Sequence, residues 1–117
     1  MKVETLFKHN DMVLVSITFP TVSEARRFSK KLVKQRLAAC VNIRPIESIY
    51  WWKGKLVLTH EATAEAKTVN GKVSAIKRFV QKYHSDQTPA LIVTAVHDTL
   101  PSYRKWVATE THKHARS

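Results

Sequence analysis

Cys40 and His84 are the residues whose chemistry best suits a metal ion. A cysteine thiolate is a soft ligand that favours Cu(I), Zn²⁺ and related ions, and a neutral imidazole nitrogen is a common metal ligand. Both residues also have structural interpretations. Free cysteine is usually a small buried hydrophobic residue, and a histidine that ends a helix can act there as a capping cation. The sequence leaves both alternatives open for each residue.

The spacing of these residue types gives no local metal motif. The chain has one cysteine and six histidines, with no Cys-x-x-Cys and no His-x-x-x-His. A metal site must therefore be gathered by folding or by assembly. A cysteine and a histidine could also form a nucleophile and its base, but no oxyanion-hole or orienting motif accompanies them. Two glycines are too few for a Gly-rich phosphate loop. We therefore expect the protein not to be an enzyme.

The length and composition predict a single domain over 1–117, with a core at about 12–108 and flexible tails at both ends. One cysteine cannot form an internal disulfide, which favours a reducing, cytoplasmic location. No segment approaches the ~20 consecutive apolar residues of a membrane span, and the first residues lack the apolar region of a signal peptide. Insertion into a membrane is therefore not expected.

The net charge of +11 raises the question of a polyanionic partner. Lysine and arginine are spread along the whole chain, and their densest cluster lies within a predicted helix (Arg26, Arg27, Lys30, Lys31, Lys34 and Arg36). On that helix most of them share the face opposite the apolar residues, as expected for a solvated face. We expect no nucleic-acid binding beyond non-specific electrostatic attraction.

Hydrophobic periodicity and turn residues predict the order strand, helix, strand, strand, helix, strand, and then a further helix. The predicted strands cover 12–18, 37–52, 55–67 and 90–96, and the predicted helices cover 24–35, 70–84 and 100–107. This order is typical of the α+β class with a ferredoxin-like βαββαβ fold, an antiparallel sheet with two helices on one face. A long hairpin between the second and third strands and a C-terminal helix extend it.

Single residues set several of the expected boundaries. Ser23 is the expected N-cap of the first helix, and Thr99 or Ser102 that of the last. Pro45 has no N–H to donate, so a bulge or bend is expected there. Lys53-Gly54 predicts the hairpin turn, with a positive φ at Gly54.

The segment "EATAEAK" at 61–67 permits two structures. Its residue types favour a helical turn, whereas the alternation of apolar and polar residues after a hairpin favours a strand. We expect the strand. The tail from Thr109 is polar, and we expect it to be loose.

Four consecutive large residues, Ile49, Tyr50, Trp51 and Trp52, lie just before the predicted turn. A strand sends successive side chains to opposite faces, so these residues place apolar surface on both faces of a two-stranded arm. Such an arm cannot cover both faces by itself, and large exposed apolar patches mark interaction sites. We expect the hairpins of an oligomer to contact one another here. The alternative is that the aromatic rings fold over the sheet of their own chain.

Several segments taken together resemble the CutA family of divalent-cation tolerance proteins. They are "RLAACVNI" (36–43), "SIYWWKGK" (48–55), Glu61, Lys67-Thr68, His84 with Pro89, and "YRKWV" (103–107). The resemblance implies a ferredoxin-like fold and a homotrimer held by long hairpin strands, with an architecture related to the PII signalling proteins. It also implies binding of copper or another divalent metal ion without an enzymatic reaction. The implied clefts between subunits are bordered by Glu61, Lys67, His84 and Tyr103.

The chain departs from the family pattern at several positions. It reads "HSDQTP" at 84–89 where members usually read "HPYEVP", and it has small residues at 62–66 where they carry large aliphatic ones. Ile17 and Tyr83 replace a cysteine and a histidine that some bacterial members have, so a site built from those two cannot be complete here. The PII likeness supports an alternative function, a module that binds a small anionic metabolite beside Lys53, Lys55 and Lys67.

Overall fold

A computed structural model describes residues 8–113. Of the flexible tails predicted on either side of a core at about 12–108, residues 1–7 and 114–117 lie outside the described residues. The elements are β1 (Met12–Phe19), α1 (Val22–Lys34), β2 (Cys40–Trp52), β3 (Lys55–Val69), the 3₁₀ turn η2 (Asn70–Lys72), α2 (Val73–Tyr83), β4 (Leu91–Ala95) and α3 (Pro101–His112).

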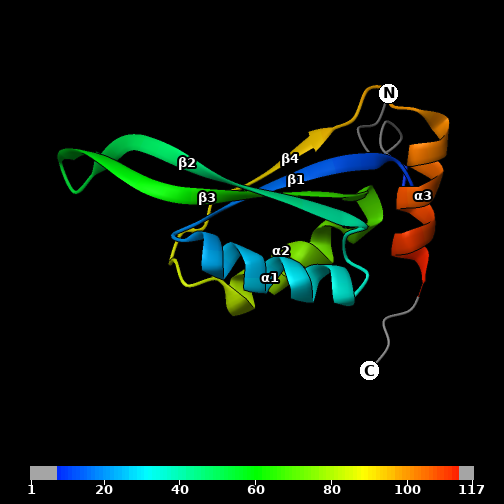
Figure 1. The fold of residues 1–117 in the computed structure, drawn as a ribbon, viewed down its shortest axis with the longest axis horizontal. Coiled ribbons are helices and arrows are strands. Elements are labelled where there is room, and N and C mark those ends of the chain that lie inside the picture. The colour runs from blue at the N-terminus through cyan, green and yellow to red at the C-terminus, as the bar shows by residue number, and fades with distance from the viewer. Residues whose placement is uncertain (1–7, 114–117) are drawn as a thin grey trace.

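The four strands form one antiparallel sheet in the order β2-β3-β1-β4, and α1 and α2 cover one of its faces (Figure 1). The predicted ferredoxin-like α+β fold is therefore confirmed. The extra helix α3 lies across one end of the sheet, and the β2–β3 hairpin projects beyond the helices at the other end.

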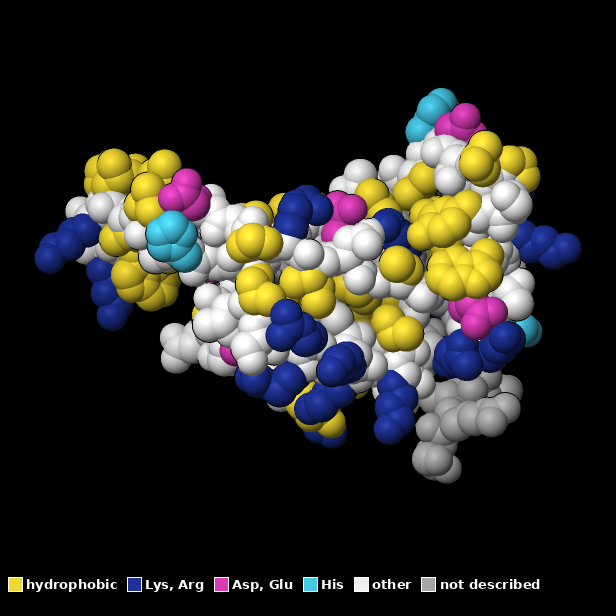
Figure 2. Space-filling view, viewed as in Figure 1, with side chains coloured by type: hydrophobic (Ala, Val, Ile, Leu, Met, Phe, Trp, Pro, Cys, Tyr) yellow, Lys and Arg dark blue, Asp and Glu magenta, His cyan; other side chains and the backbone are white. Residues whose placement is uncertain are grey.

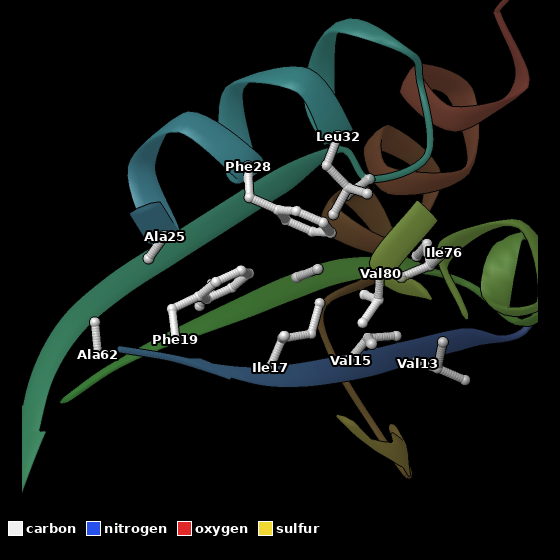
Figure 3. Packing of buried hydrophobic residues seen from close by; sticks show 13 residues of the cluster. Val13, Val15, Ile17, Phe19, Ala25, Phe28, Leu32, Ala62, Ile76 and Val80 are labelled. Atoms are coloured by element: carbon white, nitrogen blue, oxygen red, sulfur yellow. The ribbon is translucent and has the colours of Figure 1, made fainter. Parts of the chain in front are cut away.

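The core lies between the sheet and the two helices (Figure 3). Alternate residues of β1 point into it, because successive strand side chains face opposite sides. The buried side chains come from β1, α1 and α2, as labelled in the close view (Val13, Val15, Ile17, Phe19, Phe28, Leu32, Ile76 and Val80). This packing fixes the face of the sheet on which every other strand residue lies.

The alanine-rich segment of β3 is a strand, as expected from its alternation. Ala62, Ala64 and Ala66 are buried under the helices. Phe19 is the register partner of Ala62, and its ring centroid lies 5.0 Å from that of Phe28. Aromatic rings from β1 and α1 therefore lie in the same core layer as these alanines. At the alanine positions, members of the family that this sequence resembles carry larger aliphatic residues.

Replacing Ala64 by leucine is expected to lower the free energy of unfolding by about 1–3 kcal/mol, because a filled core must distort to accept extra methylene groups. Urea denaturation measures the change. Ala90→Leu makes the same substitution at an exposed position and should change stability by less than about 0.5 kcal/mol. Equal stability of both variants and the wild type would contradict a filled core at Ala64.

Three predicted helix boundaries are wrong. Thr21, not Ser23, caps α1: its backbone is extended and its hydroxyl accepts a 3.1 Å hydrogen bond from the Glu24 N–H. Neither Thr99 nor Ser102 caps α3, because Pro101 takes the first helical position behind Leu100, where its fixed φ suits a helix start. The 3₁₀ turn at Asn70–Lys72 delays the start of α2 to Val73.

The tail from Thr109, expected to be loose, is helical as far as His112. Thr111 is buried, and its hydroxyl donates to the Val107 carbonyl at 2.9 Å. Arg36 donates to the Glu110 carboxylate at 3.0 Å and so ties α3 to the segment before β2. The last turn of α3 is thus held by an ion pair that joins distant parts of the chain.

Pro45 causes no bulge, so that prediction is wrong. The β2–β3 register runs from Cys40–Lys67 to Trp52–Lys55 without a skipped residue, and Pro45 pairs with Ala62. Antiparallel pairs alternate between bonded and non-bonded positions. Counting back from the closing pair puts Pro45 at a non-bonded position, where its missing N–H faces the outer edge. Because β2 is an edge strand, no ladder hydrogen bond is lost.

The hairpin turn at Lys53-Gly54 is confirmed. Gly54 has φ +78° and Lys53 has φ +49°. Two consecutive residues with positive φ are what a type I′ turn requires, and this turn matches the twist of the strands that it joins. The turn lets β2 and β3 stay paired to the tip of the projecting arm (Figure 1).

Candidate functional site

Cys40 lies in a small polar cluster on the face of the sheet opposite the core. It pairs with Lys67 across the β2–β3 ladder, and the Lys67 ammonium donates to the side-chain oxygen of Asn42. Tyr103 of α3 contacts Cys40 from the end of the sheet and packs beside the buried residues Met12 and Val107. The fold thus brings together Cys40, Lys67 and Tyr103, which are far apart in the sequence.

The pKa of Tyr103 lies above its ordinary value. Burial is the main cause, because it disfavours the charged phenolate, and the charge and hydrogen bond of Cys40 add to the rise. The unfolded chain therefore loses the Tyr103 proton first as pH rises. The contribution of Tyr103 to stability is complete below the unfolded pKa of ~10 and is lost as pH rises through the folded pKa.

Replacing Cys40 by alanine is expected to lower the pKa of Tyr103 while leaving it above the ordinary value, because burial remains. Titration of tyrosinate absorbance measures the change, and Tyr103→Phe assigns the transition by removing it. An unchanged pKa in Cys40→Ala would show that the thiol does not act on the phenol.

The side chain of His84 is fully buried at the C-terminal end of α2, and its ring stacks on Phe19 with centroids 4.6 Å apart. Its Nε2 lies 2.7 Å from the Thr18 carbonyl oxygen, and the Asp86 N–H donates to its Nδ1 at 3.0 Å. A carbonyl can only accept and an N–H can only donate, so the proton is on Nε2 and the Nδ1 lone pair is already used. In this arrangement neither nitrogen is free to bind a metal ion.

The loop after His84 is attached to α1. The Ser85 hydroxyl lies 2.8 and 2.9 Å from the two carboxylate oxygens of Glu24 and donates to this carboxylate. The same carboxylate is 4.0 Å from His84 Nδ1, which is too far for a hydrogen bond. The unusual "HSDQTP" sequence therefore supplies its own anchor to the first helix.

Cys40 and His84 do not meet within one chain. Cys40 pairs with Lys67 of β3, and Lys67 pairs in turn with Leu14 of β1. His84 instead contacts Thr18 and Phe19, farther along β1. Four strand residues separate these positions by about 13 Å, and the two side chains lie on opposite faces of the sheet. Over residues 8–113 no group of three or more His, Cys, Asp or Glu side chains could hold a metal ion.

Glu61 lies away from the Cys40 cluster. It is on the same face of β3 as Lys67 but six residues away, about 20 Å along the strand. It borders an open groove of about 990 Å³ between the β2–β3 arm and the loop after α2; Tyr50, Ser85 and Thr88 also line this groove. Of the four residues predicted to border one cleft, Lys67 and Tyr103 thus lie in the Cys40 cluster and Glu61 lies at the groove, whereas the side chain of His84 is buried outside both.

Sequence reasoning did not identify the contact between Asn42 and Lys67, which follows only from the β2–β3 register. It missed the groove residues of the loop at 85–88 altogether. No composition or spacing signal marks these loop residues, because their role depends on which strands the loop faces.

The projecting arm exposes apolar side chains on both faces. The exposed fractions are 67% for Ile49, 38% for Tyr50, 71% for Trp51 and 58% for Trp52. Figure 2 shows hydrophobic side chains gathered at the tip of the arm beside Lys and Arg side chains. The outer strand β4 is also uncovered, with Ile92 65% exposed. The single chain therefore leaves a large apolar surface in water.

Comparison with known proteins gives a consistent result. Residues 13–110 match the family model described as CutA1 divalent ion tolerance protein. The divalent-cation tolerance protein CutA of Thermotoga maritima is 38% identical over 82% of this chain and 95% of that protein, and that of Archaeoglobus fulgidus is 36% identical over 80% and 91%.

Solved structures of such proteins have the same fold. The structure of CutA from Synechococcus elongatus matches with a TM-score of 0.85 and 28% identity, covering 90% of this chain and 93% of that one. CutA from Archaeoglobus fulgidus, described as periplasmic, matches with a TM-score of 0.83 and 33% identity, covering 86% and 98%. None of the helices described here is long and apolar enough to cross a membrane. The matched segment spans almost the whole described fold, and this chain belongs to the CutA1 divalent ion tolerance family.

Proposed function

We propose that this protein is the subunit of a homotrimer that binds copper or another divalent cation and catalyses no reaction. The exposed apolar residues of the projecting β2–β3 hairpin are the observation that supports assembly. Ile49 and Trp51 lie on one face of the arm, and Tyr50 and Trp52 lie on the other. Burial of this surface against neighbouring copies would stabilise the assembly by about 25 cal/mol for each Å² removed from water. The family description supports a divalent ion as the ligand.

Cys40 is the ligand that we place at the metal. Cys40 is half-buried and forms no disulfide, and a thiolate favours Cu(I) over harder ions. His84 is the second proposed ligand, and it needs a local rearrangement first. The loop after α2 must move so that Asp86 releases the Nδ1 lone pair. A neighbouring subunit must then bring the ligands of one chain close to those of another.

Copper titration of the purified protein tests this assignment. Cys40→Ser is expected to weaken Cu(I) binding by at least tenfold, because a hydroxyl is a poor ligand for a soft ion. His60→Ala serves as the control, since His60 is a highly exposed histidine far along the arm. Unchanged affinity in Cys40→Ser would remove Cys40 from the site. Sedimentation of the same samples reports the subunit number.

The open groove beside Glu61 supports a second function, a PII-like module that binds a small anionic metabolite between subunits. Its volume of about 990 Å³ is within the range of ligand pockets. The backbone and hydroxyl donors of Thr88 border it, and Lys53 and Lys55 of a neighbouring arm would supply positive charge. A ligand that binds only the folded state raises the melting temperature, so a thermal-shift screen of nucleotides and carboxylates against metal ions separates the two functions.

We place the protein in the cytoplasm, because its single cysteine carries no disulfide and a free thiolate ligand needs a reducing compartment. One relative is described as periplasmic. Fractionation of the source cells with antibody detection distinguishes the two locations.

A further inference from the structure

A second hollow lies on the outer side of α1, away from both regions described above. It has a volume of about 440 Å³ and is bordered by one side of α1 and by the start of β2. Its lining residues are Arg26, Ser29, Lys30, Val33, Lys34, Val41 and Ile43. The five α1 residues recur at spacings of three and one, so they form a single stripe along the helix. We call this hollow the α1–β2 groove.

The α1–β2 groove combines an apolar floor with a cationic rim. Val33, Val41 and Ile43 form the floor, and all three are partly exposed. Figure 2 shows hydrophobic side chains in the middle of this face and a band of Lys and Arg side chains over α1 below them. Within residues 8–113, none of the rim cations Arg26, Lys30 and Lys34 forms an ion pair. Their charges are therefore available to a ligand.

Ser29 provides an independent sign of a ligand. It is 5% exposed, and it is the one residue of the described chain with a buried side-chain oxygen that has no hydrogen-bond partner. A buried polar atom without a partner destabilises the folded state, so native structures retain such atoms mostly where something else satisfies them. Because Ser29 lines the groove between the apolar floor and the cations, a polar ligand atom there would satisfy it.

We propose that the α1–β2 groove binds a small amphiphilic anion, a carboxylate with an aliphatic body of about the size of a medium-chain fatty acid. The aliphatic body would cover Val33, Val41 and Ile43. The carboxylate would contact the rim cations and accept a hydrogen bond from Ser29. This proposal is independent of metal binding and of the arm, because none of the groove residues belongs to either region.

Charge and shape argue against other occupants. The net charge of +11 does not prevent assembly through the apolar arm, but it disfavours a second copy at a rim that is itself cationic. The segments outside the described residues contain a single acid, Glu4. A nucleic acid would satisfy the cations but would leave the apolar floor uncovered. A free amphiphilic carboxylate satisfies the floor, the rim and the buried hydroxyl together.

Titration of the ¹⁵N-labelled full-length protein with sodium octanoate tests the proposal. Amide shifts are expected to map to α1 and to the start of β2, and calorimetry of the same samples gives the Kd. Octanol lacks the charge and acetate lacks the aliphatic body, so each should bind about tenfold more weakly or worse. Shifts confined to other elements, or equal binding of all three compounds, would overturn the proposal.

Two variants identify the groove as the site. Lys30→Glu is expected to raise the octanoate Kd about tenfold, whereas Lys77→Glu, the same charge reversal on an exposed position of α2, should change it less than about twofold. Ser29→Ala is expected to weaken octanoate binding without lowering the melting temperature, because it removes a hydroxyl with no partner in the protein. Equal binding by Lys30→Glu and Lys77→Glu would overturn the proposal. So would a change of sedimentation in Lys30→Glu alone, since it would assign the groove to contact between copies.

Discussion

Replacing Trp51 by glutamate is expected to change the sedimentation of the protein from that of a trimer to that of a single chain. Trp51 is 71% exposed on one face of the arm, so the proposed assembly is what removes it from water. Loss of one large buried side chain costs about 1.5–3 kcal/mol per subunit, and burial of an unpaired carboxylate costs several kcal/mol more. A symmetric trimer incurs these costs three times.

A control separates loss of assembly from loss of folding. Tyr83→Glu makes a comparable aromatic-to-acid change at an exposed position of α2, on the helical layer that the arm does not reach. This variant should sediment like the wild type. Both variants should keep the wild-type circular dichroism spectrum, because neither side chain belongs to the main core cluster. A wild-type protein that sediments as one stable chain would contradict the proposed trimer directly.

Residue alternation was sufficient to predict the sheet. In β3, the period of two predicted a strand over 61–67 although the residue types favour a helical turn, and the structure has a strand there. The hairpin was predictable because few residues other than glycine adopt the positive φ that a two-residue turn requires. Strong local patterns of this kind need no knowledge of the rest of the fold.

The incorrect predictions concern features that depend on neighbouring elements. Pro45 indicates a bulge in a central strand, but β2 is an edge strand with an outward-facing position there. Thr21 and Ser23 are both acceptable N-caps by residue type, and only the extended backbone after Pro20 selects Thr21. The polar segment after Val107 has no apolar stripe, so its helix depends on tertiary contacts such as that of Arg36 with Glu110.

The residues of the candidate site were predictable one by one, but their arrangement was not, because it also depends on neighbouring elements. The sequence predicted Cys40 as a metal ligand and Lys67 and Tyr103 as borders of a cleft between subunits. The β2–β3 register together with the packing of α3 brings all three into one cluster. Sequence reasoning could not find the α1–β2 groove, because the basic residues of α1 indicate an ordinary solvated face. Only the position of β2 shows that an apolar floor lies beside them.

Replacing His84 by alanine is expected to lower the free energy of unfolding by about 2–4 kcal/mol. The substitution removes a fully buried ring that stacks on Phe19, and it leaves the Thr18 carbonyl and the Asp86 N–H without their partners. Urea denaturation measures the loss. His60→Ala is the matched control, because His60 is highly exposed on the arm, and it should change stability by less than about 0.5 kcal/mol.

The stability of His84→Ala decides how a loss of copper binding in that variant is interpreted. If the variant is destabilised as expected, weaker copper binding can follow from a displaced loop, and Cys40→Ser remains the direct test of a ligand. If His84→Ala is as stable as the wild type, the two hydrogen bonds of the ring contribute little. The ring could then be released to a metal ion at low cost, and His84 would become the stronger candidate. Copper affinity measured beside the urea midpoint of each variant therefore separates a ligand from a structural residue.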